Sequence, residues 1–512
     1  KVEMKNGLIQ IFILIWSFFQ FIYCQIPATT LAWKLLSPDG LIWSGRNAHA
    51  SCIFKNLVWV VGGHTDTYPT FNLIESDKTA DVWYSSDMKD WTQVSTLRGD
   101  FYAQNWDALQ PGPVAPWFAR YGHSLDAITV NLIIDNREQD IDLMVLTGGF
   151  APGAMNDVWV TEDGETWFFV QYAPWTPRGW HSTTVYNNTI WLIGGTPLNN
   201  EVWVLTRVRR VEDREPPLTR AMYMNYTYDF EWELRNAAAP WSPRCGMGFI
   251  AQKYPGTELG YRLVFTGGYG GIIDQHNTDF DGLRSRGDVW TTENGINWTM
   301  ISSMTEFGEN AWMGLSIWEP DSTATKPRIW MIGGGYIGDN ENKRVSTMIA
   351  SVSVYWSRDA KSWTQVNFVS GGGKSTLARY SSSEWAETTI DGDLYYLGLW
   401  GLTSEVYTID GLTRLYILGG DQDGGGTYMA AVYQGMQGLL CDIEGEKCNG
   451  RGDCASTDTS VGSCVCTGAT GQYCETPVGG RKNSAIRSHT VQKDILFISL
   501  LFCSLSFFIM YI

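Results

Sequence analysis

Five arginines recur in similar sequence surroundings and are the first candidates for chemistry. They are Arg46, Arg120, Arg178, Arg244 and Arg379. A cluster of guanidinium groups can bind a substrate carboxylate through paired hydrogen bonds, and with a tyrosine and a glutamate beside it such a cluster could serve the hydrolysis of an acidic sugar. Residues that recur at one place in a repeat usually serve the fold, so we expect these arginines to be structural.

Histidines recur in the same way. His49, His123 and His181 each end a motif that begins with one of these arginines, as "RNAH", "RYGH" and "RGWH". A copper site of the kind that galactose-oxidase-like enzymes use needs histidine and tyrosine ligands at one point. The repeated position favours a structural role, and His64 and His276 stand away from other residues at ligand spacing. We therefore expect no metal and no cofactor.

The composition narrows the class of protein further. The chain of 512 residues has a formal net charge of −17 and a pI near 4.8, which repels the phosphates of nucleic acids. Its 44% hydrophobic content is ample for one large core. No P-loop, dinucleotide fingerprint, HExxH motif or nucleophile elbow occurs in the sequence. We expect a protein that acts by binding, without nucleic acid as a partner.

A repeated pattern must position these residues. A short apolar run ends in two glycines, a pair such as Val82-Trp83 follows, and a tryptophan then begins another strand. Paired glycines suit a strand that ends in a tight bend, where positive φ and close backbone approach are needed. The six glycine pairs are Gly62-Gly63, Gly148-Gly149, Gly194-Gly195, Gly267-Gly268, Gly333-Gly334 and Gly419-Gly420. Small antiparallel sheets that repeat in this way bury their faces by stacking, which predicts a β-propeller.

These repeats resemble the kelch repeat over about Leu31 to Gly435. The resemblance implies an all-β, six-bladed kelch-type β-propeller over residues 29–436. The region from Arg379 to Asp410 lacks a glycine pair, so it is either an insertion or a degenerate seventh blade. The sixth repeat lacks its tryptophan strand, and "WKLL" from Trp33 to Leu36 matches that strand, so the N-terminal segment is expected to complete the last blade.

Four turns resemble the Asp-box of sialidases; they end at Trp91, Trp167, Trp298 and Trp363. In such a turn an aspartate side chain accepts hydrogen bonds from backbone amides nearby, and the tryptophan packs into the sheet. The turns are therefore expected to serve folding and not catalysis.

Six cysteines gather near the C-terminus with the spacing C-x6-C-x5-C-x9-C-x-C-x7-C, and a module this short depends on disulfides for stability. The spacing resembles a small disulfide-rich EGF-like domain over residues 441–474. The resemblance implies the pairs Cys441–Cys454, Cys448–Cys464 and Cys466–Cys474, and no calcium site. The tripeptide from Arg451 to Asp453 matches an integrin-binding motif, although a structural Gly-x-Gly explains most of it.

Cys52 and Cys245 are expected to be free, buried thiols.

The chain ends indicate the secretory route. Residues 4–24 have the pattern of a signal peptide with cleavage before Gln25. Residues 475–494 form a stalk and possible lipid-anchor signal, and the hydrophobic segment 495–512 is either part of a glycolipid-anchor signal or a single transmembrane helix. Both place the folded part on the outer face of the cell. The candidate glycosylation sites are Asn187, Asn225 and Asn297.

The expected function is recognition or adhesion at the cell surface. A propeller with an EGF-like module is found in such proteins, and long loops over a rigid ring suit a binding surface for an extracellular protein or a glycan. The candidate ligand-binding residues are Tyr68, Tyr102, Trp106, Trp117 and Tyr336. Some of these rings could instead cap the core. The alternative is an extracellular propeller enzyme, either a sialidase-like glycosidase or a galactose-oxidase-like oxidase.

Overall fold

The structure is a computed structural model, and it divides the chain into one compact unit over Lys1–Leu439 and a second over Leu440–Ile512. In the first unit it describes residues 30–36, 43–65, 78–94, 96–100, 105–112, 115–134, 136–212, 226–258, 260–271, 284–319, 324–338, 347–350, 354–370, 389–390, 393–394, 399–421 and 429–437. In the second unit it describes residues 442–443, 446–447, 452–454, 464–466, 469–470 and 476–477. The residues 4–24 and 495–512 of the predicted terminal segments lie outside these ranges.

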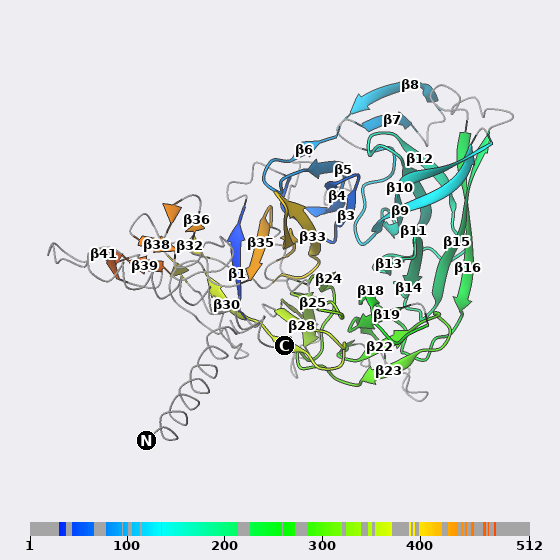
Figure 1. The fold of residues 1–512 in the computed structure, drawn as a ribbon. Helices are drawn as coiled ribbons and strands as arrows, with labels where there is room; N and C mark the ends of the chain where they lie inside the picture. The colour runs from blue at the N-terminus through cyan, green and yellow to red at the C-terminus, as the bar shows by residue number, and fades with distance from the viewer. Residues whose placement is uncertain are drawn as a thin grey trace, which may run out of the picture. The chain divides into compact units, whose positions relative to one another are not determined.

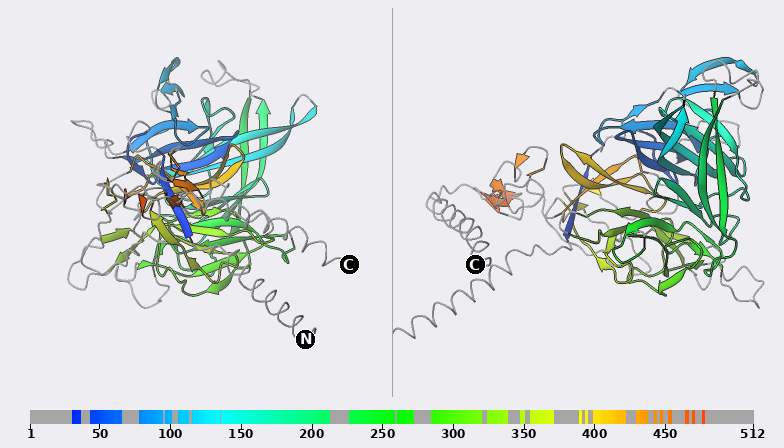
Figure 2. Two further views of the ribbon diagram at one scale, coloured as in Figure 1. Left: turned by 60° about the vertical axis from the view of Figure 1, so that its left-hand side comes forward. Right: turned by 45° about the vertical axis from the view of Figure 1, so that its right-hand side comes forward.

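Six antiparallel sheets of the described residues share one strand pattern (Figures 1 and 2). The innermost strands are β3 (Ala50–Phe54), β9 (Ser124–Ile134), β13 (Ser182–Tyr186), β18 (Gly248–Lys253), β24 (Gly314–Ile317) and β33 (Thr403–Ile409). The second strands are β4 (Leu57–Thr65), β10 (Arg137–Phe150), β14 (Thr189–Ile193), β19 (Tyr261–Thr266), β25 (Ile329–Ile332) and β34 (Leu412–Leu418). The third strands are β5 (Lys78–Ser85), β11 (Ala154–Thr161), β15 (Val202–Glu212), β22 (Val289–Thr292), β28 (Val354–Ser357) and β35 (Val432–Gln437).

The outermost strands complete each sheet. They are β6 (Thr92–Gln93), β12 (Trp167–Tyr172), β16 (Tyr226–Asn236), β23 (Thr299–Ser302), β29 (Thr364–Gln365) and, in the sixth sheet, β1 (Thr30–Leu35). β1 pairs antiparallel with β35, with Trp33 opposite Gly435, which confirms that the N-terminal segment completes the last sheet. On its other side β1 pairs in parallel with β30 (Asn367–Ser370). Both edges of β1 are therefore hydrogen-bonded.

The six sheets form a closed ring, which makes this unit a β-propeller. Each innermost strand contacts the innermost strand of the next sheet, and β33 returns to β3. One backbone amide from each sheet also donates to a carbonyl of the preceding sheet. These bonds run from Ala48 to Gly401, Gly122 to Ala48, Trp180 to Gly122, Gly246 to Trp180, Trp312 to Gly246 and Gly401 to Trp312, at 2.7–3.0 Å. Because this ring of hydrogen bonds is complete with six members, a seventh blade has no place in it.

The closed ring shows which part of the region from Arg379 to Asp410 belongs to a blade. Residues 403–409 form the innermost strand of the sixth sheet, and Thr389–Ile390 and Asp393–Leu394 form a separate two-stranded ladder, β31 with β32. The position that Arg46 and Arg120 occupy in their sheets belongs to Leu399 here, because the amide of Gly334 donates to Leu399 as that of Gly63 does to Arg120. The expectation that Arg379 continues the arginine series was wrong in this respect; Arg379 itself lies outside the described residues.

The core is divided among the interfaces between neighbouring sheets. The second strands are apolar on both faces because each face packs on a different neighbour. In β4, Val58 and Val60 pack with the sixth sheet, while Trp59 and Val61 pack with the second. The same holds around the ring, with one buried cluster at each of the six interfaces. A run of apolar residues without alternation is thus explained by burial on both sides.

The predicted turns have the expected geometry. Asp163 Oδ1 accepts hydrogen bonds from the amides of Glu165 and Thr166 at 2.8 and 2.7 Å, and Trp167 Nε1 donates to the carbonyl of Gly164. Asp87, Asn294 and Asp359 accept the corresponding bonds in the other three turns. The Asp-box-like segments are therefore folding devices in this chain.

No membrane-spanning helix is found in the part of the chain that the structure describes.

The second unit is described only by short strands. They are β36 (Asp442–Ile443), β37 (Glu446–Lys447), β38 (Gly452–Cys454), β39 (Cys464–Cys466), β40 (Ala469–Thr470) and β41 (Thr476–Pro477). They pair in three antiparallel ladders, and Cys454 lies opposite Cys464 in the second of them. Cys441, Cys448 and Cys474 lie outside the described residues, so the EGF-like module and its disulfide pairing remain predictions.

Candidate functional site

The recurring arginines hold the sheets together. The Arg120 guanidinium donates to both carboxylate oxygens of Asp157 and to the carbonyl of Gly148, with all three distances at 2.7–2.8 Å. Arg46 binds Asp81 in the same way, and Arg178 and Arg244 pair with Glu201 and Asp288. These four arginine side chains are at most 2% exposed. Their hydrogen bonds serve the fold, as expected, because each guanidinium group is already paired with a carboxylate of its own sheet.

The recurring histidines are also part of the packing. His49 Nε2 lies 3.0 Å from Thr403 Oγ1, and His181 Nε2 lies 3.2 Å from Thr147 Oγ1. Burial, followed by the charge of the nearest arginine, lowers the pKa of His49 and of His181 to about 3 and that of His123 well below its ordinary value. The three rings are therefore neutral at physiological pH. Among the described residues no group of three or more potential ligand side chains could hold a metal ion.

An aromatic surface lies around the axis at the end of the sheets where the glycine pairs stand. We call it the axial aromatic surface; its members are His64, Tyr121, Phe150, Trp180, Tyr269, Trp312 and Trp400, and each side chain is half-buried. The ring centroids of Trp180 and Trp312 are 5.7 Å apart, and those of Trp312 and Trp400 are 5.9 Å apart. Tyr121, Phe150 and Tyr269 extend the set through contacts of 5.1–5.8 Å. All six sheets contribute a residue to it.

The backbone of the hydrogen-bonded ring positions the central tryptophans. Trp180 and Trp312 have φ values of 50° and 54°, a region that bulky residues rarely adopt. The Trp180 indole lies over Gly122, where a Cβ would come within 2.6 Å of the ring, so glycine is required there. The other four positions of the ring also have positive φ, so this backbone geometry belongs to the ring, and Trp180 and Trp312 are the two aromatic side chains that it carries.

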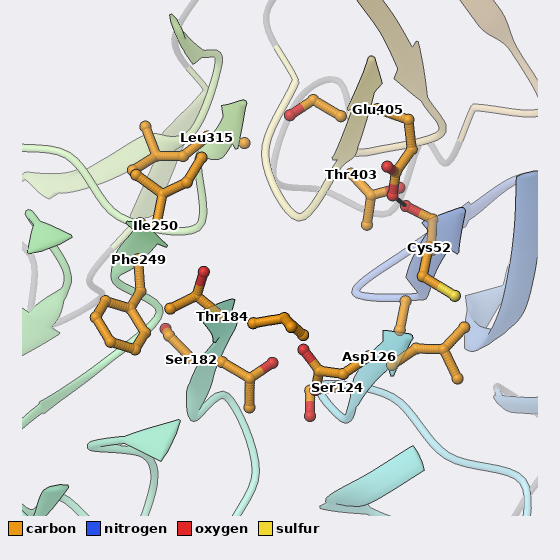
Figure 3. Close-up of a pocket in the computed structure, with 18 of the residues that line it drawn as sticks. Cys52, Ser124, Asp126, Ser182, Thr184, Phe249, Ile250, Leu315, Thr403 and Glu405 are labelled. Carbon is orange, nitrogen blue, oxygen red and sulfur yellow. Dashed lines mark hydrogen bonds between the residues drawn. The ribbon is translucent and has the colours of Figure 1, made fainter. Parts of the chain in front are cut away.

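A cavity of about 450 Å³ lies on the axis between the innermost strands (Figure 3). All polar side chains of its lining come from the sheets of β33, β3, β9 and β13, which form its polar wall and also contribute apolar residues such as Leu125, whereas β18 and β24 contribute an apolar wall of Phe249, Ile250 and Leu315. Its volume is within the range of small-molecule sites, about 300–1,000 Å³. A smaller cavity of about 150 Å³ is lined by Trp180, Trp312 and the three recurring histidines.

Two carboxyl groups stand in the polar wall, and sequence reasoning did not single them out. Asp126 is 6% exposed and its Oδ2 has no hydrogen-bond partner within the described part of the chain, while Glu405 Oε1 accepts a 2.6 Å hydrogen bond from Ser51. Burial raises the pKa of Asp126 to about 7, and it raises the pKa of the half-buried Glu405 as well. Cys52 lies on the strand between them, and burial, Glu405 and Asp126 all raise the pKa of its thiol. A sequence signal existed for Asp126, because it stands three residues after His123 as Cys52 does after His49, whereas Glu405 follows Leu402, where no motif marks the position.

Of the five predicted ligand-binding residues, the structure describes Trp117 and Tyr336. Tyr68, Tyr102 and Trp106 lie outside the described residues. Trp117 is 4% exposed and packs edge-on against Trp167 with centroids 4.4 Å apart, so its place in the predicted surface set was wrong. It belongs to a repeated core pair, which recurs as Trp43 with Trp91, Trp175 with Trp232, Trp241 with Trp298 and Phe307 with Trp363. Tyr336, on β26 (Gly335–Gly338), is 38% exposed.

The remaining candidates are two cysteines and three glycosylation sequons. Cys52 and Cys245 are free and buried, as expected. Asn187 and Asn297 are exposed in turns, whereas Asn225 lies outside the described residues. The turns that carry Asn187 and Asn297 join first to second and third to fourth strands, so they stand at the end of the sheets opposite the glycine pairs.

Comparison with known protein families gives no match, and no curated protein matches the chain. Among solved structures the chain is similar to that of YjhT, with 14% sequence identity, coverage of 78% of this chain and 96% of that chain, and a TM-score of 0.43. The β-propeller fold of this chain rests on its own sheets and on the closed ring of hydrogen bonds.

Proposed function

We propose that this chain is an extracellular recognition protein that binds a carbohydrate through the axial aromatic surface. The observation that carries the proposal is the set of half-exposed rings gathered around one axis, with Trp180 and Trp312 held at positive φ. Aromatic faces stack well on the C–H faces of sugar rings, while Tyr121 and His64 add polar atoms at the edge. The surface consists of seven half-buried side chains, whereas a stable protein partner usually covers about 800 Å² with about 20–30 residues.

The placement of the sequons supports this choice of face. Asn187 and Asn297 lie at the opposite end of the sheets, so glycans attached there leave the axial aromatic surface free. Tyr336 stands at the same end as the aromatic surface and is exposed. It is the described residue from the predicted loop set that we retain as part of the binding face.

An outward-facing location is part of the same proposal. The six clustered cysteines favour an oxidising compartment, and an EGF-like module after the propeller fits a cell-surface protein. A glycolipid anchor or a single membrane helix would hold it there. The enzymatic alternative has less support, because Arg46, Arg120, Arg178 and Arg244 already use their guanidinium groups within the sheets.

A glycan array probed with the purified full chain tests the proposal. We expect selective binding to a carbohydrate class, and we expect the binding to be competed by the free sugar in solution. A chain that binds no carbohydrate on the array, but captures a protein from deglycosylated cell surfaces, would contradict the proposal and favour a protein ligand.

A further inference from the structure

We propose that the axial cavity binds a small organic ammonium compound, with its charged group between Asp126 and Glu405 and its hydrocarbon part against Phe249, Ile250 and Leu315. This is a second site, separate from the axial aromatic surface and independent of the function proposed for that surface. The cavity volume of about 450 Å³ suits a ligand of this size.

The first argument is the hydrogen bonding of Asp126. Its side chain is more than nine-tenths buried and lines the cavity; the Thr183 and Ser124 side chains interact with its carboxyl group, yet Oδ2 has no hydrogen-bond partner among the described residues. A buried carboxylate oxygen without a partner is costly, and a ligand that donates a hydrogen bond would remove that cost. Glu405 lines the same wall from β33, and its Oε1 is oriented by Ser51.

The second argument is the charge of the wall. Among the described residues that line the cavity there is no lysine or arginine, and the nearby Arg46, Arg120 and Arg178 are paired with acidic residues of their own sheets. Asp126 and Glu405 therefore have no basic partner in the lining, and burial keeps them protonated up to near neutral pH. An ammonium ion would supply the missing positive charge and would displace these protons to the solvent.

The third argument is the asymmetry of the cavity. The carboxyl groups stand on one side, and the apolar side chains of β18 and β24 stand on the other (Figure 3). A bare metal ion would leave that apolar wall unused, and the described residues provide no group of three ligand side chains for one. A cation that carries a hydrocarbon part matches both walls.

Isothermal titration calorimetry of the full chain with n-butylammonium chloride tests the site, with n-butanol as the neutral comparison. We expect n-butanol to bind at least about tenfold more weakly, because it lacks the charge. At pH 7 the binding enthalpy should depend on the ionisation enthalpy of the buffer, since protons are released. Affinity should fall between pH 8 and pH 5 as the carboxyl groups take up protons. His49, His123, His181 and Cys52 face the same region and stay neutral in this range, so they do not produce this change.

The variant with Asp126→Asn and Glu405→Gln keeps the shape of both side chains and should lose at least about tenfold in affinity for n-butylammonium. Asp229→Asn is the matched control, because Asp229 lies on β16 outside the cavity lining. Equal binding of n-butanol, unchanged affinity in the double variant, or no saturable binding at millimolar concentration would each overturn the proposal. If the double variant does not fold, the buffer dependence of the wild-type enthalpy decides, and an enthalpy that is the same in all buffers overturns it.

Discussion

Each recurring arginine is a buried charge with a single compensating carboxylate, and this makes the pair sensitive to the loss of either member. In the second sheet Arg120 and Asp157 are 0% and 5% exposed at their side chains. Arg120→Met would leave the Asp157 carboxylate buried without its counterion. We expect the free energy of unfolding to fall by about 3–5 kcal/mol, measured by chemical denaturation.

Arg209→Met is the control for this variant, because Arg209 is 43% exposed and pairs with Asp229 at the surface. A surface pair contributes about 1 kcal/mol or less, so this variant should be nearly as stable as the wild type. If Arg120→Met were equally stable but lost ligand binding, the arginines would belong to a binding site and the structural account would be wrong.

The buried carboxyl groups of the axial cavity predict a pH dependence of stability. Asp126 has a folded pKa of about 7, above its ordinary value of 3.8, so the folded state holds a proton that the unfolded state has lost between these values. Stability therefore falls as pH rises from about 4 to 7, and Glu405 acts in the same direction. The recurring histidines act oppositely below pH 6.5, because their pKa values are lowered.

The difference in unfolding free energy between wild type and the variant with Asp126→Asn and Glu405→Gln, measured at each pH, isolates the contribution of the two carboxyl groups to stability. We expect this difference in unfolding free energy to shift in favour of the variant between pH 4.5 and pH 7.5, by a few kcal/mol at most. Parallel pH profiles for the two proteins would show that both carboxyl groups titrate normally.

For single residues, the sequence predicts the role of a position that recurs among the repeats better than the role of a position that differs among them. The arginines and histidines were assigned structural roles because they recur; the four described arginines pair with carboxylates, and His49 and His181 contact threonine hydroxyls. Asp126 and Glu405 were missed because an acidic residue stands at that position in only two sheets. The axial aromatic residues were missed because the prediction looked for binding residues in the long loops, whereas Trp180 and Tyr121 stand within the repeated arginine motif itself.

Among the elements, β1 has the greatest influence on the ring, since it joins the first residues of the propeller to the last sheet. It lies between β30 and β35 and is hydrogen-bonded on both sides. Proline at Ala32 would remove an amide from one of these ladders. We expect Ala32→Pro to lower the unfolding free energy by about 3 kcal/mol and to speed amide exchange in β35 and β34, measured by mass spectrometry.

Ala32→Gly keeps the amide and should cost about 1 kcal/mol or less. If proline and glycine had the same effect, β1 would not be closing the sheet. Sequence predicted this element because "WKLL" repeats a pattern seen in other sheets. The segment "SEVYTID" reads as strand material, but the sequence did not predict that β33 is the innermost strand of the sixth sheet, because Leu399-Trp400-Gly401 replaces the arginine motif there.

The whole propeller is held by one apolar interface between each pair of neighbouring sheets, and it presents two unlike ends. The glycine-pair end carries the axial aromatic surface, while the opposite end carries the exposed turns of Asn187 and Asn297. Repeats predict the ring, because each sheet needs a neighbour on both faces. They do not predict the function of either end, since function depends on the few positions that vary.

Binding of the carbohydrate by the variant with Tyr121→Ala, Trp312→Ala and Trp400→Ala is therefore the most direct test of the proposed function. The control variant carries Ile133→Ala, Ile296→Ala and Met300→Ala, which are exposed apolar residues at the opposite end. We predict that the first variant loses at least about tenfold in affinity with little change in its unfolding midpoint, while the control binds as the wild type does. Unchanged affinity in the first variant, or an equal loss in both, would contradict the assignment of the axial aromatic surface as the binding site.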